Sequence, residues 1–269
     1  MSFNLQEGSY IYRGDAFGVS ARFEHPDKVL VPTQAQAILA ATGGEASSVV
    51  RDFNFQDRVM FSEATARAVG TSHDDTYYTD VTATIRDFRF MQVHADFINM
   101  HIASVHRRSG RTPVAIDEGD VTFTGSTISG LIVAGNKIEI EWDETLSKYP
   151  TFERLHAALP KRGVTYGCGT TKHHLKHDTI ASIVGGVKQL SDSEKKALRK
   201  DPTANLTGVR FYRNVVLVPD FGKIFIGEVL IERAIRRINM LRIELGCGTG
   251  GGGTAGGGTG NGADIPPAP

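Results

Sequence analysis

The residues best suited to chemistry are three histidines and a carboxylate in one short polar stretch, Lys172-His-His-Leu-Lys-His-Asp178. On a helix, His173 and His177 would share one face about 6 Å apart, close enough to bind one Zn²⁺ ion. On a strand, the same pair would be about 13 Å apart, which is too far for one ion. The threonines and β-branched residues on either side favour a strand or loop, so we interpret the stretch as a solvated loop. If a metal ion is bound, its predicted ligands are His173, His177 and Asp178, and no other cofactor is predicted.

The remaining histidines and acidic clusters are spread along the chain. His94 and His101 are seven positions apart, so on an unbroken strand they would point to opposite faces. With His106, we interpret them as ordinary surface or packed histidines. The acidic clusters at Asp74-Asp75 and Asp117-Glu118 are typical of polar turns rather than of a calcium loop. The sequence has no nucleophile elbow, phosphate loop or His-Glu-x-x-His motif, so no catalytic residues are predicted.

Two cysteines occupy similar glycine-flanked settings, Gly167-Cys168-Gly169-Thr170 and Gly246-Cys247-Gly248-Thr249. Reduced thiols are the expectation in a cytoplasm. A disulfide between Cys168 and Cys247 would close a loop of about 80 residues and stabilise the fold by about 4 kcal/mol. The sequence leaves both alternatives open.

The composition is that of an ordinary globular protein. Of 269 residues, 40% are hydrophobic and 22% are charged, and 30 Lys and Arg balance 30 Asp and Glu. A net charge of zero gives no general attraction to nucleic acid. The amino terminus has no signal-like apolar segment, and no run of residues is long and apolar enough to cross a bilayer. We therefore predict a cytoplasmic protein with no nucleic-acid partner and no transmembrane segment. Export without a signal is the alternative.

The composition changes abruptly near the carboxyl terminus. Residues 1–245 are predicted to form a single β-rich globular domain. Residues 246–269 are dominated by glycine and threonine and have almost no apolar surface to offset their chain entropy. We therefore predict that they form a disordered tail.

Alternation with a period of two residues dominates the domain and predicts strands. For example, Phe17, Val19, Ala21 and Phe23 are expected to share one face of an extended segment. Three short helices are also expected, each from local capping, alanine or proline signals. They are at Thr33–Thr42, Thr151–Leu159 and Ser191–Lys200.

These elements predict a mainly β protein, an antiparallel sandwich or partly closed barrel built from hairpins, with the three helices at its edges. A short motif supports the hairpins, because Arg51-Asp-Phe-Asn-Phe55 returns as Arg86-Asp-Phe-Arg-Phe90 and more loosely at Arg213–Leu217. Such recurrence suggests duplication of a unit of strand, tight turn and strand. A stacked β-solenoid is the alternative fold.

Two parts of the chain are similar to proteins of a known but uncharacterised group. The stretches Val216–Ile231 and Asn239–Gly246, together with the opening Gly8–Ser20, resemble segments of uncharacterised bacterial proteins. Those proteins are β-rich, lack a signal peptide and have no assigned activity. The resemblance therefore implies a β-rich fold and carries no site residue over to this chain.

Repeated hairpins, strands able to pair at their edges and a flexible glycine tail together favour a non-enzymatic role. The sequence predicts a binding or structural module that acts through self-assembly, as a homo-oligomer, or through a protein partner. The alternative is a hydrolase-type or metal-dependent enzyme on a β-scaffold that uses the His/Asp cluster at residues 173–178.

Overall fold

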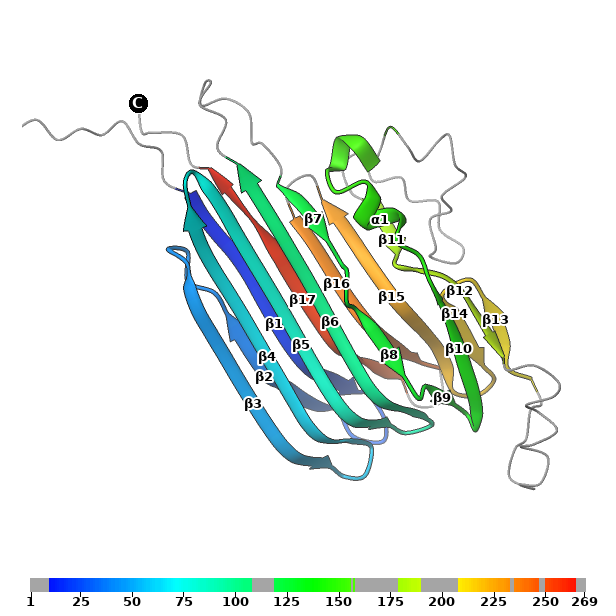
Figure 1. Cartoon of the computed structure of the whole chain (residues 1–269). Helices are drawn as coiled ribbons and strands as arrows, with labels where there is room; N and C mark the ends of the chain where they lie inside the picture. The colour runs from blue at the N-terminus through cyan, green and yellow to red at the C-terminus, as the bar shows by residue number, and fades with distance from the viewer. Residues whose placement is uncertain are drawn as a thin grey trace, which may run out of the picture.

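The structure is a computed structural model, and it describes residues 10–107, 119–155, 157, 179–189, 208–232, 235–246 and 250–264. Two antiparallel sheets, here called sheet A and sheet B, pack face to face as a sandwich (Figure 1). The prediction of a mainly β, hairpin-built sandwich is confirmed. The described strands form neither a closed barrel nor a solenoid.

Each sheet is described by the order in which its strands pair. Sheet A has eight strands, in the order β13 (Arg210–Tyr212), β14 (Val215–Val218), β15 (Gly222–Glu232), β16 (Ile235–Leu245), β17 (Gly251–Asp264), β1 (Tyr10–Phe23) and β2 (Val29–Ile38), with β11 (Thr179–Ser182) beside β15. Sheet B has nine, in the order β12 (Val184–Gln189), β10 (Asn136–Trp142), β9 (Ile132–Val133), β6 (Val93–Arg107), β5 (Thr76–Phe90), β4 (Val59–His73) and β3 (Gly44–Phe55), with β7 (Asp120–Thr122) and β8 (Thr127–Ser129) beside β6.

Strands β3 to β6 follow one another as a meander joined by tight turns. Positive φ angles occur at Gln56 and Asp57 between β3 and β4, and at Asp74 and Asp75 between β4 and β5. Two-residue hairpin turns whose twist matches the strands require positive φ at both central residues, which aspartate tolerates well. The interpretation of Asp74-Asp75 as a polar turn is therefore confirmed.

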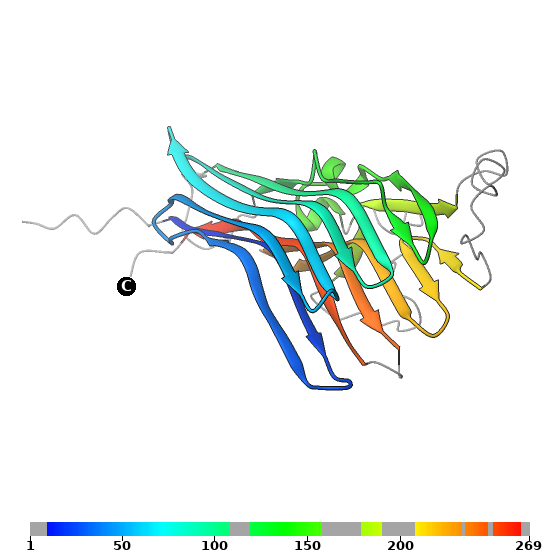
Figure 2. The same ribbon diagram turned by 90° about the horizontal axis from the view of Figure 1, so that it is seen from below.

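Both sheets bend sharply at one level of the sandwich (Figure 2). In sheet B, Asp52 in β3 and Asp87 in β5 have φ angles of 51° and 52°, and the pairing with each neighbouring strand skips these residues. Ser62 of β4 donates a 2.6 Å hydrogen bond to the Asp87 carboxylate. The repeated Arg-Asp-Phe motif is thus explained, because each copy places an aspartate at the bend of alternate strands.

The bends in sheet A are made by other residue types. Gly227 in β15 and Gly256 in β17 have φ angles of 59° and 60°. The pairing of β1 with β17 skips Gly18. The bend at Gly18 shifts the alternation of β1, so that Phe17 lies on the outer face while Val19 is buried. The expectation that Phe17 shares a face with Val19 is therefore wrong, because the strand is not regular there.

The prediction of a helix at Thr33–Thr42 is also wrong. Most of this segment belongs to β2, where Ala35 and Ala37 are buried and Gln36 between them is exposed. The segment has alanines of high helix propensity, but the alternation of burial from Gln34 to Ile38 fits the pleat of an edge strand paired with β1. Tertiary context thus overrides local propensity.

The largest correction concerns the carboxyl terminus. Residues 251–264 form β17, which pairs with β1 on one side and β16 on the other, so this part of the expected tail is a central strand of sheet A. The globular domain accordingly extends beyond residue 245. Backbone hydrogen bonds to two neighbours offset the entropy that a glycine segment loses on folding.

Large side chains of sheet B fill the space that the glycines leave. A Cβ atom at Gly258 would lie 2.4 Å from Cε of Met100, and one at Gly260 would lie 2.8 Å from Cγ2 of Ile102. Met100 and Ile102 are fully buried. The glycine composition therefore permits close packing of the two sheets, and it does not indicate disorder here.

Helical structure is sparse in the part of the chain that the structure describes. Helix α1 spans Thr145–Lys148, and helical residues at 152–155 lie within the expected helix Thr151–Leu159. The helix expected at Ser191–Lys200 lies outside the described residues. Among the described residues, no helix has the length and apolar character needed to span a bilayer.

Candidate functional site

The two long sides of the sandwich differ. On one side, the chain passes from β11 in sheet A directly to β12 in sheet B. The Val187 backbone N–H donates to the Arg213 carbonyl at 2.8 Å, and the Ile183 N–H donates to the Gly227 carbonyl at 3.0 Å. Backbone hydrogen bonds thus join the sheets there, and we call this the closed side.

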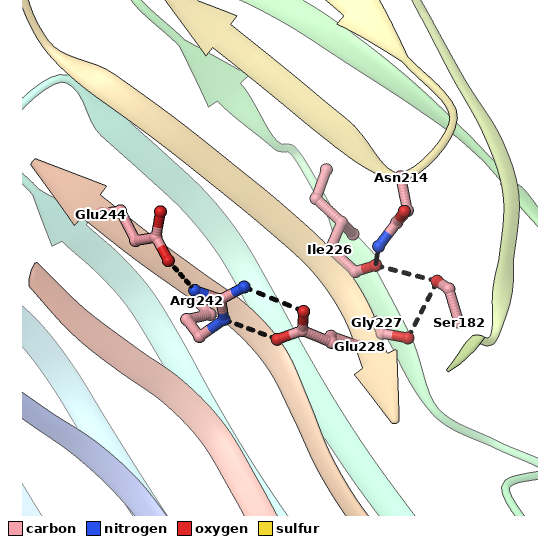
Figure 3. Close-up of polar contacts among 7 residues, drawn as sticks. All are labelled: Ser182, Asn214, Ile226, Gly227, Glu228, Arg242 and Glu244. Carbon is pink, nitrogen blue, oxygen red and sulfur yellow. Dashed lines mark hydrogen bonds and ion pairs between the residues drawn. The ribbon is translucent and has the colours of Figure 1, made fainter. Parts of the chain in front are cut away.

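A set of polar contacts holds the closed side (Figure 3). Ser182 Oγ donates to the carbonyls of Ile226 and Gly227 at 3.1 and 2.9 Å, and Asn214 Nδ2 donates to the Ile226 carbonyl at 3.1 Å. These contacts fix the bend of β15, where Gly227 has positive φ. Side chains from β11 and the β13–β14 turn therefore converge on one strand and tie three elements together.

The outer face next to this bend carries a partly buried ion pair, also drawn in Figure 3. Arg242 contacts both carboxylate oxygens of Glu228, at 2.5 and 2.9 Å, and also binds Glu244. Its guanidinium lies 3.7 Å from the centroid of the Phe225 ring. Burial lowers the pKa of Arg242, but the two carboxylates outweigh burial and raise it. The cluster is suited to holding β15 against β16, because a bidentate arginine–carboxylate pair fixes geometry.

The opposite side has no such cover among the described residues, and we call it the open side. Sheet A ends there at β2 and sheet B ends at β3, and the two edge strands lie next to each other (Figure 1). Three exposed apolar side chains border this side, namely Leu30 at 68%, Ile38 at 63% and Val49 at 49% exposed. Unpaired strand edges of this kind are able to pair with another strand.

The edge of β2 is less regular than that of β3. Pro32 lies within β2, and the register of β2 against β1 shifts between Val19 and Ala21. Proline lacks a backbone donor, and an irregular edge pairs poorly. By contrast, β3 pairs with β4 without interruption from Gly44 to Arg51 and contains no proline.

The core is incomplete under β3. None of its residues is fully buried, although Val50, Phe53 and Phe55 face inward and pack against buried residues. Phe53 stacks on Phe61 of β4, with ring centroids 5.0 Å apart. An inner face that is only half covered at the end of a sheet is typical of a surface that another chain can cover.

Charges of alternating sign cross sheet B and end at β3. Glu63 of β4 lies between Arg86 of β5 and Arg51 of β3, with N–O distances of 4.0 and 2.8 Å. A second pair joins Arg67 of β4 to Glu45 of β3 at 2.8 Å. The hydrogen bond from Arg67 lowers the pKa of the Glu45 carboxyl. The edge strand therefore presents one negative and one positive side chain on its outer face.

A shallow groove of about 700 Å³ lies on the outer face of sheet A. Residues of β1, β2, β16 and β17 line it. Gly257 of β17 leaves room for the Phe17 ring, since a Cβ atom there would lie 2.1 Å from Cζ of Phe17. Burial raises the pKa of Asp15 in this groove, against the opposing effects of the Thr259 hydroxyl and Arg237. Asp15 is the only carboxylate among the described residues that line the groove, and none of these residues is a histidine. The described lining residues therefore bring together no pair of carboxylates and no carboxylate–histidine pair in this groove.

A family model described as a domain of unknown function (DUF8256) matches residues 10–196. The chain belongs to this family. No curated protein and no solved structure matches the chain. The match begins at β1 and runs past β12, so it covers both strands of the open side and the crossing from sheet A to sheet B. Of the stretches that suggested an uncharacterised family, Val216–Ile231 and Asn239–Gly246 lie beyond the match.

The family assignment names no functional residues, so the predicted ones are placed by the structure alone. The candidate metal ligands His173, His177 and Asp178 lie outside the described residues, as do Cys168 and Cys247. Among the residues that are described, no group of three or more His, Cys, Asp or Glu side chains is placed to hold a metal ion. The metal site and the disulfide remain predictions.

The placement of the β6 histidines differs from the expectation. Ala95 and Ile98 are both buried, so the alternation of β6 shifts at its bend and places His94 and His101 on the same, outer face. His101 Nδ1 lies 2.5 Å from the Thr124 carbonyl oxygen, and its Nε2 lies 2.7 Å from the Asp80 carboxylate. Burial lowers the pKa of His101, but these two acceptors outweigh burial and raise it.

The sequence did not predict which strands form the open side. Edge strands cannot be told from central ones by alternation, because both alternate. One signal was present, since the inward positions of β3 include Ala46 and Ser48, which bury less apolar surface than the inward residues of β5. A strand with few large core residues is suited to an edge.

Proposed function

We propose that the protein is a non-enzymatic binding or structural module that acts by docking a polypeptide on its open side. The main support is the edge strand β3, which pairs regularly with β4 and whose inner face is only half covered. A docked strand would satisfy the outward backbone groups of β3 and would cover Val50 and Phe53. Self-assembly and binding of a different protein are both forms of this function.

The difference between the two long sides supports this proposal. The closed side has backbone hydrogen bonds between the sheets and the polar contacts of Ser182 and Asn214. The open side has exposed Leu30, Ile38 and Val49 instead. Natural β proteins usually protect long regular edges by charge, proline or cover. The edge of β2 follows this rule through Pro32, whereas β3 contains no proline and pairs without interruption from Gly44 to Arg51.

Site-specific photo-crosslinking in cells tests the proposal. A photoreactive residue replaces Val49, which is on the edge strand, or Tyr78, which is on β5 inside the same sheet. The two side chains are similarly exposed, at 49% and 43%, so exposure alone predicts equal labelling. We expect discrete adducts, to another copy or to another protein, from position 49 and none from position 78. Equal adducts from both positions, or none from position 49, would refute docking at the open side.

The enzymatic alternative rests on residues 173–178, and no contact among the described residues favours it. The glycine segment no longer supports tethering, because residues 251–264 are part of sheet A. The open side is therefore the feature of the described residues that supports a binding module.

A further inference from the structure

We propose that the strand docked on β3 is the β3 of a second copy of this chain, paired antiparallel about a twofold axis at Ser48. This inference rests on the proposed function, because it names the partner that the open side binds. It would join two copies of sheet B into one continuous sheet across the twofold axis. A closed twofold contact of this kind uses the same surface on both copies.

The limits of the regular part of β3 define the centre of the pairing. Gly44 has a φ of 100° and Asp52, at the bend, has a φ of 51°. Between them the strand pairs with β4 residue by residue. Ser48 lies at the midpoint, so pairing about Ser48 uses the whole regular stretch of both copies and ends at both irregular points. Any other centre would oppose part of one regular stretch to a bend.

The charges of β3 are complementary in this same register. Pairing about Ser48 places Glu45 of each copy opposite Arg51 of the other, with both side chains on the outer face. These residues already belong to ion pairs within one copy, at 2.8 Å to Arg67 and to Glu63. The dimer would extend the alternation from Arg86 and Glu63 through Arg51 to Glu45 and Arg67 of the second copy. Opposite charges directly across a strand pair stabilise it, and like charges destabilise it.

The apolar residues agree with this arrangement. The inner face of β3 would place Val50 of each copy opposite Ala46 of the other, which are both half-buried residues packed against the core. On the outer face, Val49, which is 49% exposed, would lie opposite Ser47. A small residue therefore faces each valine, and the exposed apolar surface at the strand edge becomes covered.

Light scattering coupled to size-exclusion chromatography, across micromolar to millimolar concentration, is the first test. We expect a dimer for the wild-type full chain. Glu45→Lys and Arg51→Glu each place like charges opposite one another and should raise the dissociation constant about tenfold or more. A mixture of the two variants should form a heterodimer, because each Lys then faces a Glu and each Arg faces a Glu. Arg89→Glu, an exposed charge reversal inside sheet B, is the control and should leave the dimer intact.

Disulfide trapping then tests the register. In a Cys168→Ser/Cys247→Ser background, Ser48→Cys should form an intermolecular disulfide under mild oxidation, because the two residues 48 face each other at a bondable distance. Ser47→Cys is more exposed but would face residue 49 of the other copy, so it should crosslink far less. Circular dichroism of each variant verifies that the β-sheet is retained.

Three outcomes would overturn the inference: a monomer at every concentration, a dimer unaffected by both charge reversals, or crosslinking stronger at position 47 than at position 48. The proposed function, docking at the open side, is refuted by a different result from the one that refutes the dimer. A monomer whose position 49 still forms adducts with a different protein removes only the second copy as partner, whereas loss of all adducts from position 49 removes docking at the open side.

Discussion

Substitution of Gly260 by alanine tests whether β17 is a packed strand, because the contact there involves side chains only. The added Cβ atom would lie 2.8 Å from Cγ2 and 3.3 Å from Cβ of Ile102. Attractive carbon contacts begin at about 3.5 Å, so the first contact is roughly 0.7 Å too short. Ile102 is fully buried, and its branched side chain has little rotamer freedom in which to escape.

The expected loss follows from two opposing effects. Overpacking of a core costs about 1–3 kcal/mol. Alanine also restricts the unfolded chain more than glycine does, which returns about 0.4–1 kcal/mol. We therefore expect Gly260→Ala to lower the free energy of unfolding by about 1–2 kcal/mol. Urea denaturation with an unchanged m-value measures it.

A double-mutant cycle identifies the contact responsible. Ile102→Ala removes Cγ2 and should itself cost about 2–5 kcal/mol. Combined with Gly260→Ala, the total should be smaller than the sum by about 1 kcal/mol or more, since the new methyl group enters the space left by Ile102. Ile102→Val keeps Cγ2, so its combination with Gly260→Ala should show no such rescue. Gly185→Ala is the control for the glycine change, since its nearest neighbours would be 3.6 and 3.7 Å away. Additive costs in the alanine cycle, or a stabilised Gly260→Ala, would show that β17 does not pack on β6 here.

Four further results are expected. Removal of residues 250–269 deletes a strand between β1 and β16, so it should abolish the cooperative thermal transition, whereas a disordered tail would leave it unchanged. Glu228→Gln leaves Arg242, whose side chain is 23% exposed, with a weaker partner and should cost about 1–3 kcal/mol in urea denaturation. Because the pKa of His101 is raised in the folded state, protonated His101 contributes its full stabilisation below the unfolded pKa of about 6.5, and this stabilisation is lost as the pH rises through the folded pKa. Asp80→Asn should lower the pKa of His101 measured by NMR titration and should weaken the dependence of stability on pH. Elemental analysis of untagged protein tests the metal hypothesis, which predicts a stoichiometric ion that is lost on changing His173 or His177 to alanine.

The fold class could be predicted from the sequence because alternation follows directly from strand geometry. Where the strand is irregular, the same reasoning fails. His94 and His101 share a face only because β6 bends between them, and Phe17 turns outward because β1 bends at Gly18. A single residue out of phase reverses every assignment beyond it, and the alternation pattern by itself does not reveal where such a residue lies.

The glycine segment shows a different limit of sequence reasoning. Its composition predicts disorder because the segment by itself buries little apolar surface. In the fold, the apolar surface at this position comes from Phe90, Ile98, Met100 and Ile102 on the opposite sheet, each of which would contact a Cβ atom placed on β17. The complementary residues are more than 150 positions away in the sequence, so the match between small and large residues is visible only once the sheets are stacked.

The bends connect the fold with the proposed assembly. Two of them are encoded by the repeated Arg-Asp-Phe motif, with aspartates that accept positive φ at residues 52 and 87. In β5, which is central, the bend serves to curve the sheet together with its neighbours. In β3, which is at the edge, the same bend also ends the stretch available for pairing, so that Gly44 and Asp52 bound a segment centred on Ser48. Arg51 of the motif contacts Glu63 and is the residue expected to meet Glu45 of the second copy. One duplicated motif would thus set both the curvature of sheet B and the register in which its edge pairs.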